Sequence, residues 1–164
     1  MPFKVIILVN QKDLYWINMD THIDINELIN FTKSIKLLYI EDNEEAQESM
    51  IGLLSNFFTN ITVSNDGLEG LNAFEKNRYD LIITDIHMPN MNGTQMISHI
   101  RKNDPDIYII VLSAYNNIIP DEIEIDSIKI DDFLIKPIQM NNLMTTLIKL
   151  YNKKRDLNVS ICKN

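Results

Sequence analysis

Several short apolar runs of this chain end in polar residues whose types and order can do chemistry. Glu41 and Asp42 follow one run, and Asp85, Ser113 and Lys136 follow three later ones. Crowded carboxylates repel one another, so a site that gathers these three acids must hold a cation or raise a pKa. Oxygen donors without a His or Cys partner suit Mg²⁺, with Mn²⁺ as the alternative. Asp85 can then attack phosphorus to form an acyl phosphate, while Lys136 and Ser113 bind phosphoryl oxygens.

An alternation of strands and helices has to position these side chains. The apolar runs predict strands at 35–40, 61–63, 81–84, 107–112 and 133–135. Helices are expected at 44–58, from 66 towards 77, from 93 to about 104, at 116–129 and at 139–151. Five such pairs call for an α/β fold, a doubly wound five-stranded parallel sheet of flavodoxin-like order 2-1-3-4-5. The first and third strands are neighbours in that order, so the three acids at their ends converge.

The first 34 residues form an extension to this plan. Residues 3–9 and 14–19 predict a β-hairpin, and Asp24 with Glu27 has the spacing of a capping box that opens a short helix. An isolated hairpin is marginal in water, so this one must pack on something. Two interpretations stay open, a dimerisation or docking element and a flap on its own domain. The expected divisions are an extension at 1–34, a domain at 35–152 and a flexible tail at 153–164.

Composition and charge exclude several classes of protein. Of the 164 residues 45% are hydrophobic and 23% charged, which is ordinary for a globular domain. A formal net charge of −8 argues against extensive binding to the phosphate backbone of a nucleic acid. No apolar run approaches the roughly 20 residues of a membrane span. Cys162 is the only cysteine, so an internal disulfide is excluded. We therefore expect a cytoplasmic protein with neither a nucleic acid nor a membrane as partner.

Four motifs together resemble the receiver domain of two-component response regulators, the chemotaxis-regulator-like family. They are Glu41-Asp42, Asp85 with its sequel MPNMNG, Ser113-Ala114 and Lys136-Pro137, in family order and near family spacing over about residues 35 to 152. The resemblance implies a phosphorelay signalling domain, not an enzyme that turns over a substrate. A histidine kinase, a phosphotransfer protein or a small acyl-phosphate donor would phosphorylate Asp85. Phosphorylation would then change a protein-interaction face that binds a downstream protein target. A homodimer is a further alternative.

The same resemblance implies a magnesium ligand set. Asp42 and Asp85 would bind Mg²⁺ directly, and Glu41 would hold it through a water molecule. The backbone carbonyl of His87 would complete the set. Each acid also has a structural interpretation, because Asp and Glu at a strand-to-helix junction commonly cap or open the helix.

The resemblance also implies a switch. Lys136 would pair with the phosphoryl group and Ser113 would turn towards it. Phe133, three residues before the lysine, stands where the family keeps its switch aromatic, although a core aromatic is the safer structural interpretation. Two modulating residues are hypotheses: the ring of His87 at the edge of the pocket and Tyr115 beside Ser113, both controlling access of water to the phosphoryl group.

Two other functions compete with the receiver. One is a phosphohydrolase of the haloacid dehalogenase type, which also forms an aspartyl phosphate. Such enzymes keep a second Asp two residues after the nucleophile, where this chain has His87. The other is a pseudo-receiver used only for binding, which the intact set of acids, Ser and Lys argues against.

The chain departs from the family pattern in its later part. Lys129 stands where the family usually has glycine, and Pro120 interrupts the expected fourth helix. Residues 122–126 alternate like a strand, so the conformation of 116–129 is in doubt. Thirteen residues follow Tyr151, too few for an effector module. We therefore expect either a stand-alone receiver or one excised from a larger protein.

Overall fold

The computed structural model describes residues 3–9, 13–19, 24–114 and 128–161, with side chains placed for 24–114 and 128–156. Its strands are β1 Phe3–Val9, β2 Asp13–Met19, β3 Lys36–Ile40, β4 Asn60–Ser64, β5 Leu81–Asp85, β6 Tyr108–Ser113 and β7 Asp132–Ile135. Its helices are α1 Ile25–Ser34, α2 Glu44–Leu54, α3 Gly67–Lys76, α4 Gly93–Asn103 and α6 Met140–Ile161. Strands and helices alternate from β3 onwards, as the apolar pattern predicts.

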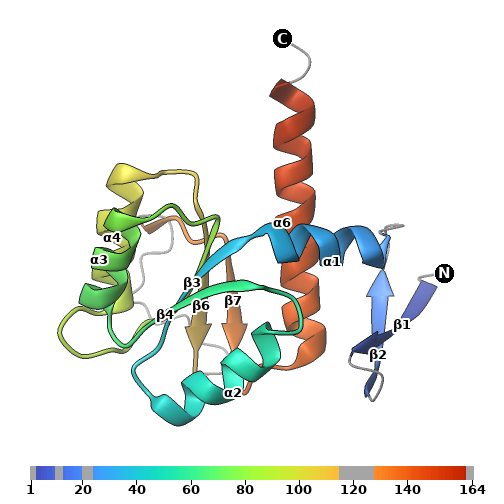
Figure 1. Ribbon diagram of the computed structural model, residues 1–164, viewed down its shortest axis with the longest axis horizontal. Helices are drawn as coiled ribbons and strands as arrows, with labels where there is room; N and C mark the ends of the chain where they lie inside the picture. The colour runs from blue at the N-terminus through green and yellow to red at the C-terminus, as the bar shows by residue number, and fades with distance from the viewer. Residues whose placement is uncertain (1–2, 10–12, 20–23, 115–127, 162–164) are drawn as a thin grey trace.

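Five of the strands form one parallel sheet in the order β4-β3-β5-β6-β7 (Figure 1). Numbered along the domain, this is the predicted order 2-1-3-4-5, so the fold prediction is confirmed. Ile40 at the end of β3 pairs with Thr84 near the end of β5. The two residues that follow them, Glu41 and Asp85, therefore leave the sheet side by side at its carboxyl edge.

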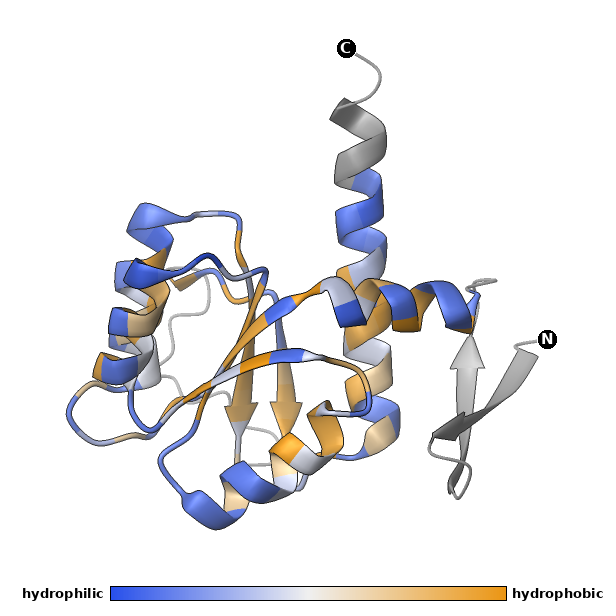
Figure 2. Ribbon diagram, viewed as in Figure 1, coloured by the Kyte–Doolittle hydropathy of each residue, from blue (hydrophilic) through white to orange (hydrophobic). Residues whose placement is uncertain are grey.

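The central strands are apolar throughout because helices cover both faces of the sheet. Alternate side chains of β3 point to opposite faces. Leu37 and Tyr39 pack in one core with residues of α1, α2 and α6, whereas Leu38 and Ile40 pack in a second core with α3 and α4. Figure 2 shows the result: the central strands of the sheet are mainly hydrophobic, and α3 and α4 turn a hydrophilic side to solvent. A strand buried on both faces shows no polar alternation.

The helix α2 ends at Leu54, so its predicted end at 58 is wrong. The side chains that follow satisfy the last helical carbonyls, which lack partners inside the helix. The Ser55 hydroxyl donates to the carbonyl of Ile51 at 2.7 Å, and the Asn56 amide donates to the carbonyl of Leu53 at 3.0 Å. Residues 57 and 58, both Phe, are buried in the turn that follows.

The last helix continues beyond its predicted end at Tyr151 and is helical as far as Ile161. Residues 153–161, part of the tail expected to be flexible, are thus helical. Lys153 pairs with Asp131 in the loop before β7, which ties the added turns to the domain. Straight-chain basic residues are also good helix formers. In Figure 1 the far end of α6 stands clear of the sheet. None of the described helices is both long and apolar enough to cross a membrane.

The N-terminal extension contains the predicted hairpin and helix. β1 and β2 pair antiparallel with Phe3 opposite Met19, and Asp24 caps α1 by accepting from a backbone N–H at 2.8 Å. The α1 helix packs on α6, where the rings of Phe31 and Tyr151 meet edge to face at 5.2 Å. The Tyr151 hydroxyl donates to the Glu27 carboxylate, which raises the pKa of Tyr151. These contacts place the helix of the extension on its own domain. Dimerisation stays a prediction.

Candidate functional site

The site lies where β3 and β5 end at the carboxyl edge of the sheet. Glu41 comes directly after β3 and is 1% exposed, and Asp85 is the last residue of β5 and is half-buried. Their positions follow from the register of the two strands. In open parallel sheets such an edge, at the point where the strand order reverses, is the usual place for a ligand.

Lys136 joins the two carboxylates. Its Nζ atom lies 2.5 Å from Oε2 of Glu41 and forms a second ion pair with Oδ2 of Asp85. The backbone N–H of Lys136 donates to the carbonyl of Ser113 at 2.7 Å, which fixes the start of the β7–α6 loop beside β6. Burial acts to lower the pKa of Lys136, but the hydrogen bonds and charges of Asp85 and Glu41 outweigh it and raise that pKa. The lysine therefore stays charged.

The Asp85 side chain is fixed from two directions. Its Oδ1 atom accepts from the backbone N–H groups of Ile86 and His87, at 2.5 and 3.0 Å, while Oδ2 faces Lys136. The loop then folds back, because the Gly93 N–H donates to the carbonyl of Ile86 at 2.8 Å. A Cβ atom at position 93 would lie 2.3 Å from the Asp85 carbonyl oxygen, so only glycine fits there.

A second set of contacts holds the middle of the same loop. Asn90 adopts a left-handed backbone with φ 62°, and its side-chain amide donates to Asp66 Oδ2 at 2.6 Å. The Gly67 N–H donates to the carbonyl of Met91 at 3.2 Å. The hydrogen bonds that Asp66 accepts from the Glu69 N–H and from Asn90 lower the pKa of its carboxyl group. The loop after Asp85 is thus anchored to the start of α3.

The structure separates Asp42 from the other two acids. Its neighbour Glu41 is buried, whereas Asp42 lies in the bend after β3 and is exposed. The Gln47 amide donates to the Glu41 carbonyl at 2.6 Å and holds this junction in place. As the described side chains stand, no three His, Cys, Asp or Glu residues gather closely enough to hold a metal ion. Two of the three predicted acids, Glu41 and Asp85, share one cation.

The remaining predicted residues lie around this edge. Ser113 ends β6 and is half-buried, and His87 is exposed beside Asp85. Phe133 is 43% exposed on β7, so its interpretation as a core aromatic is wrong. Tyr115 and most of the doubtful segment 116–129 lie outside the described residues.

Sequence reasoning missed Tyr39, whose hydroxyl donates to the Glu41 carboxylate. Burial first, and then the negative charges of Glu41 and Asp85, raise the pKa of Tyr39 well above its usual value. The signal was present in the sequence. Tyr39 lies two residues before Glu41 in an aliphatic strand, and residues at that spacing share a face of the sheet.

These charges define what the site can do. Two carboxylates against one ammonium leave a surplus negative charge, and all the offered donors are oxygen atoms. The Lys136 ammonium already occupies a cation position between Glu41 and Asp85. This chemistry fits a hard divalent cation such as Mg²⁺, which favours carboxylates and keeps several of its own waters.

Comparisons with known proteins identify the domain that carries these residues. A model of the response regulator receiver domain matches residues 37–148. The transcriptional regulatory protein PcoR of Escherichia coli is 28% identical over 127 residues, which are 77% of this chain and 56% of that protein. The chain spans about half, or less, of the length of the curated relatives it matches.

Solved structures show the same fold. The N-terminal domain of an uncharacterized protein from Wolinella succinogenes is 34% identical, with a TM-score of 0.66 over 74% of this chain and 98% of that one. The response regulator TrrA of Thermotoga maritima, solved in complex with Mg²⁺ and BeF, is 29% identical, with a TM-score of 0.62 over 71% and 98%.

Neither competing function, the phosphohydrolase or the pseudo-receiver, is favoured by these similarities. The match covers most of the domain that carries Glu41, Asp85 and Lys136. This chain belongs to the response regulator receiver domain family, the signalling domains of two-component systems.

Proposed function

We propose that Asp85 is the phosphoacceptor of this receiver domain. The observation that carries the proposal is the way its carboxylate is held: Oδ1 accepts two backbone N–H bonds, and Oδ2 faces the Lys136 ammonium. Both interactions orient the carboxylate towards the open carboxyl edge of the sheet. A nucleophile that is held in one geometry avoids the entropic cost of finding it during the reaction.

The transfer uses a phosphohistidine of a histidine kinase or phosphotransfer protein, or a small acyl phosphate. An oxygen of Asp85 attacks phosphorus, and a P–O bond forms as the P–N bond to the donor imidazole breaks. The electron pair of that bond goes to the imidazole nitrogen, which takes a proton from water. With an acyl phosphate the P–O bond to the donor breaks instead, and a carboxylate leaves. Lys136 then pairs with one phosphoryl oxygen and Ser113 hydrogen-bonds another.

The proposed metal site uses the residues at the same edge. Asp85 and Asp42 would bind Mg²⁺ directly, Glu41 through water and His87 through its backbone carbonyl, with Mn²⁺ as an alternative. When bound, the cation neutralises negative charge on the transferred group. Since Asp42 is exposed, its side chain has to turn inward to join the set.

The signal leaves through a protein-contact face around β6 and β7. Ser113 pairs with Ile135 in the sheet, and the exposed Phe133 pairs with Val111 two residues earlier. A phosphoryl group adds charge and acceptor oxygens at Asp85. A shift of Ser113 towards that group changes the surface beside Phe133. A downstream protein binds to this changed surface. The formal net charge of −8 favours a protein target over direct nucleic-acid contact.

Mass spectrometry after incubation with acetyl phosphate and Mg²⁺ tests the proposal. The wild type should gain one phosphoryl group, Asp85→Ala should gain none, and the exposed control Asp156→Ala should behave as wild type. Labelling of Asp85→Ala at the wild-type level would overturn the assignment. Following the loss of label after donor removal extends the test to His87→Asn and Tyr115→Ala. The proposal that these residues control water access predicts that at least one rate changes.

A further inference from the structure

Tyr39 lies against the phosphoacceptor site, although the proposed phosphoryl transfer gives it no part. It is the fourth residue of β3 and is 0% exposed, and Glu41, just after that strand, is 1% exposed. Tyr39, Glu41 and Lys136 line the same pocket at the carboxyl edge of the sheet. The Tyr39 hydroxyl donates to the Glu41 carboxylate and also lies near the charge of Asp85. The polar end of this buried ring is therefore directed at the acids of the site.

The backbone of Glu41 is fixed independently of its side chain. Its N–H donates to the carbonyl of Ser64 at 3.1 Å, and its carbonyl accepts from the Gln47 amide at 2.6 Å. The orientation of its carboxylate then depends on the side-chain torsions. Lys136, at 2.5 Å, and Tyr39 both donate to that carboxylate. Both donors thus constrain the direction in which it points.

The two donors differ in what else holds them. Lys136 also pairs with Asp85, and in the proposed function it pairs with a phosphoryl oxygen. The Tyr39 ring is packed in the core cluster that contains Met50 of α2. A side chain inside a close-packed core has little room to move. The Tyr39 hydroxyl is thus a fixed partner of Glu41, whereas the Lys136 ammonium is a shared one.

We propose that Tyr39 is a positioning residue of the magnesium site and acts through Glu41. Its hydroxyl keeps the Glu41 carboxylate in one orientation beside Asp85. Without this donor the carboxylate turns towards the Lys136 ammonium and away from the cation. Loss of a hydrogen-bond partner of a metal-binding side chain typically weakens metal binding by about tenfold or more. This role rests on the proposed function, because the cation has to bind at this edge of the sheet.

Isothermal titration calorimetry with MgCl₂ on the whole chain tests this role. Tyr39→Phe removes the hydroxyl and keeps the ring, so the dissociation constant for Mg²⁺ should rise about tenfold. Tyr108→Phe is the matched control, because Tyr108 is buried in the same core cluster but begins β6 at the amino edge. It should bind Mg²⁺ as wild type does. An unchanged dissociation constant in Tyr39→Phe, or an equal rise in Tyr108→Phe, would overturn the proposal.

Labelling by acetyl phosphate separates this role from general damage to the site. In Tyr39→Phe the Mg²⁺ concentration that gives half the maximal labelling rate should rise about tenfold. The rate at saturating Mg²⁺ should return to the wild-type value. A rate that stays low at saturating Mg²⁺ would overturn the proposal, because the hydroxyl would then be needed for more than cation binding.

The wild type separates the two possible failures. If it binds no Mg²⁺, the proposed metal site and the role of Tyr39 both fall. If it binds Mg²⁺ and is labelled at Asp85 while Tyr39→Phe matches it in both measurements, the role of Tyr39 falls alone.

Discussion

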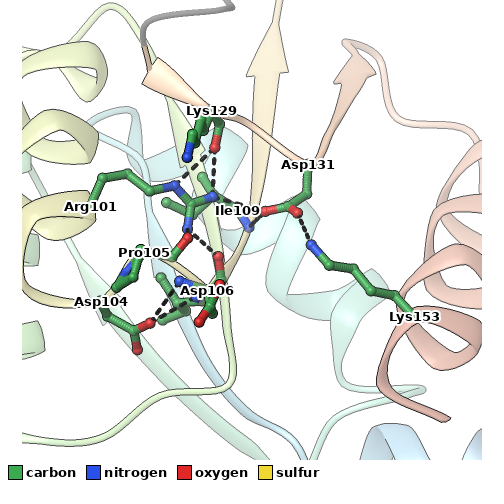
Figure 3. Close-up of polar contacts among 9 residues, drawn as sticks. Arg101, Asp104, Pro105, Asp106, Ile109, Lys129, Asp131 and Lys153 are labelled. Atoms are coloured by element: carbon green, nitrogen blue, oxygen red, sulfur yellow. Dashed lines mark hydrogen bonds and ion pairs between the residues drawn. The ribbon is translucent and has the colours of Figure 1, made fainter. Parts of the chain in front are cut away.

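Two charge clusters lie at opposite edges of the same sheet, and their charges balance in opposite ways. At the carboxyl edge, Lys136 alone faces two acids, Glu41 and Asp85. At the amino edge, Asp131 alone faces two bases, Arg101 and Lys153 (Figure 3). Both clusters join elements that are far apart in the sequence.

The amino-edge cluster is satisfied by backbone groups as well as by charges. The Arg101 guanidinium donates to the carbonyls of Lys129, Pro105 and Ile107 and pairs with Asp131 at 2.9 Å (Figure 3). Asp131 also accepts from the Ile109 N–H at 2.9 Å. The cluster thus ties α4, the start of β6, the loop before β7 and the extended part of α6 together.

This difference in charge balance indicates that the amino-edge cluster contributes to stability and the carboxyl-edge cluster to function. At the amino edge the two cations, Arg101 and Lys153, pair with one acid, and Arg101 also donates to several carbonyls. Removing one of these side chains therefore leaves buried groups with fewer partners. At the carboxyl edge the two acids repel each other beyond what one ammonium compensates, and a bound cation would offset that repulsion. Repulsion of this kind is typical of functional sites.

The largest stability effect should come from Arg101→Ala. The change removes one of the charged partners of Asp131 and the guanidinium that donates to the carbonyls of Lys129, Pro105 and Ile107, and we expect the free energy of unfolding to fall by about 3 kcal/mol. Urea unfolding measures this loss. The exposed neighbour offers a control, since Lys102→Ala should change stability by less than about 0.5 kcal/mol. A loss below about 1 kcal/mol for Arg101→Ala would refute a structural role for the amino-edge cluster.

Removing one carboxylate charge at each edge tests the comparison directly. Asp131→Asn should lower the free energy of unfolding by about 2 kcal/mol, because Arg101 and Lys153 lose their charged partner. Asp85→Asn should change it by less than about 1 kcal/mol, or raise it, because one repelling charge is removed. Paired urea unfolding curves give both values. If both variants lost the same free energy of unfolding, the proposed difference in charge balance between the two edges would be refuted.

Magnesium should stabilise the folded protein by binding at the carboxyl edge and not at the amino edge. At ten times its dissociation constant, a ligand that binds the folded state adds about 1.4 kcal/mol to stability. We expect this gain in the wild type and in Asp131→Asn, and its loss in Asp85→Asn. Unfolding curves across a series of MgCl₂ concentrations, matched in ionic strength with NaCl, measure it. An equal gain in Asp85→Asn would place the ion elsewhere.

The smallest effect concerns Lys129, whose carbonyl accepts from Arg101. Its φ of 47° lies in the left-handed region, which costs a residue with a Cβ atom about 1 kcal/mol. Lys129→Gly should therefore raise the free energy of unfolding by up to about 1 kcal/mol, the gain being reduced by the entropy of glycine in the unfolded chain. Lys102→Gly inside α4 should do the reverse. A loss of stability in Lys129→Gly would show that the lysine side chain contributes more than the backbone conformation costs.

Lys129 also shows what the sequence predicts and what it leaves out. The resemblance predicts glycine at position 129, and the structure shows that Lys129 adopts a left-handed backbone with its side chain in place. The sheet order and the strand-end positions of Glu41 and Asp85 were predictable, because uninterrupted apolar runs predict strands covered on both faces.

Features that depend on contacts between distant residues were not predictable. The ion pair of Lys153 with Asp131 holds the extra turns of α6, and the periodicity near Tyr151 carries no sign of it. The end of α2 is set by side chains after Leu54 that bond back to its carbonyls, and apolar spacing alone runs past them. The outward side chain of Asp42 depends on the local backbone at the strand end, which residue type does not determine.

The length of α6 has a mechanical consequence. The helix has 22 residues, so it is about 33 Å long, and it begins only four positions after Lys136. Its first turns are buried against the sheet, while its far end stands clear (Figure 1). Packing in the core as far as Tyr151 and the ion pair of Lys153 with Asp131 hold most of this rod against the domain, so only the turns after Lys153, about 12 Å of helix, project beyond it.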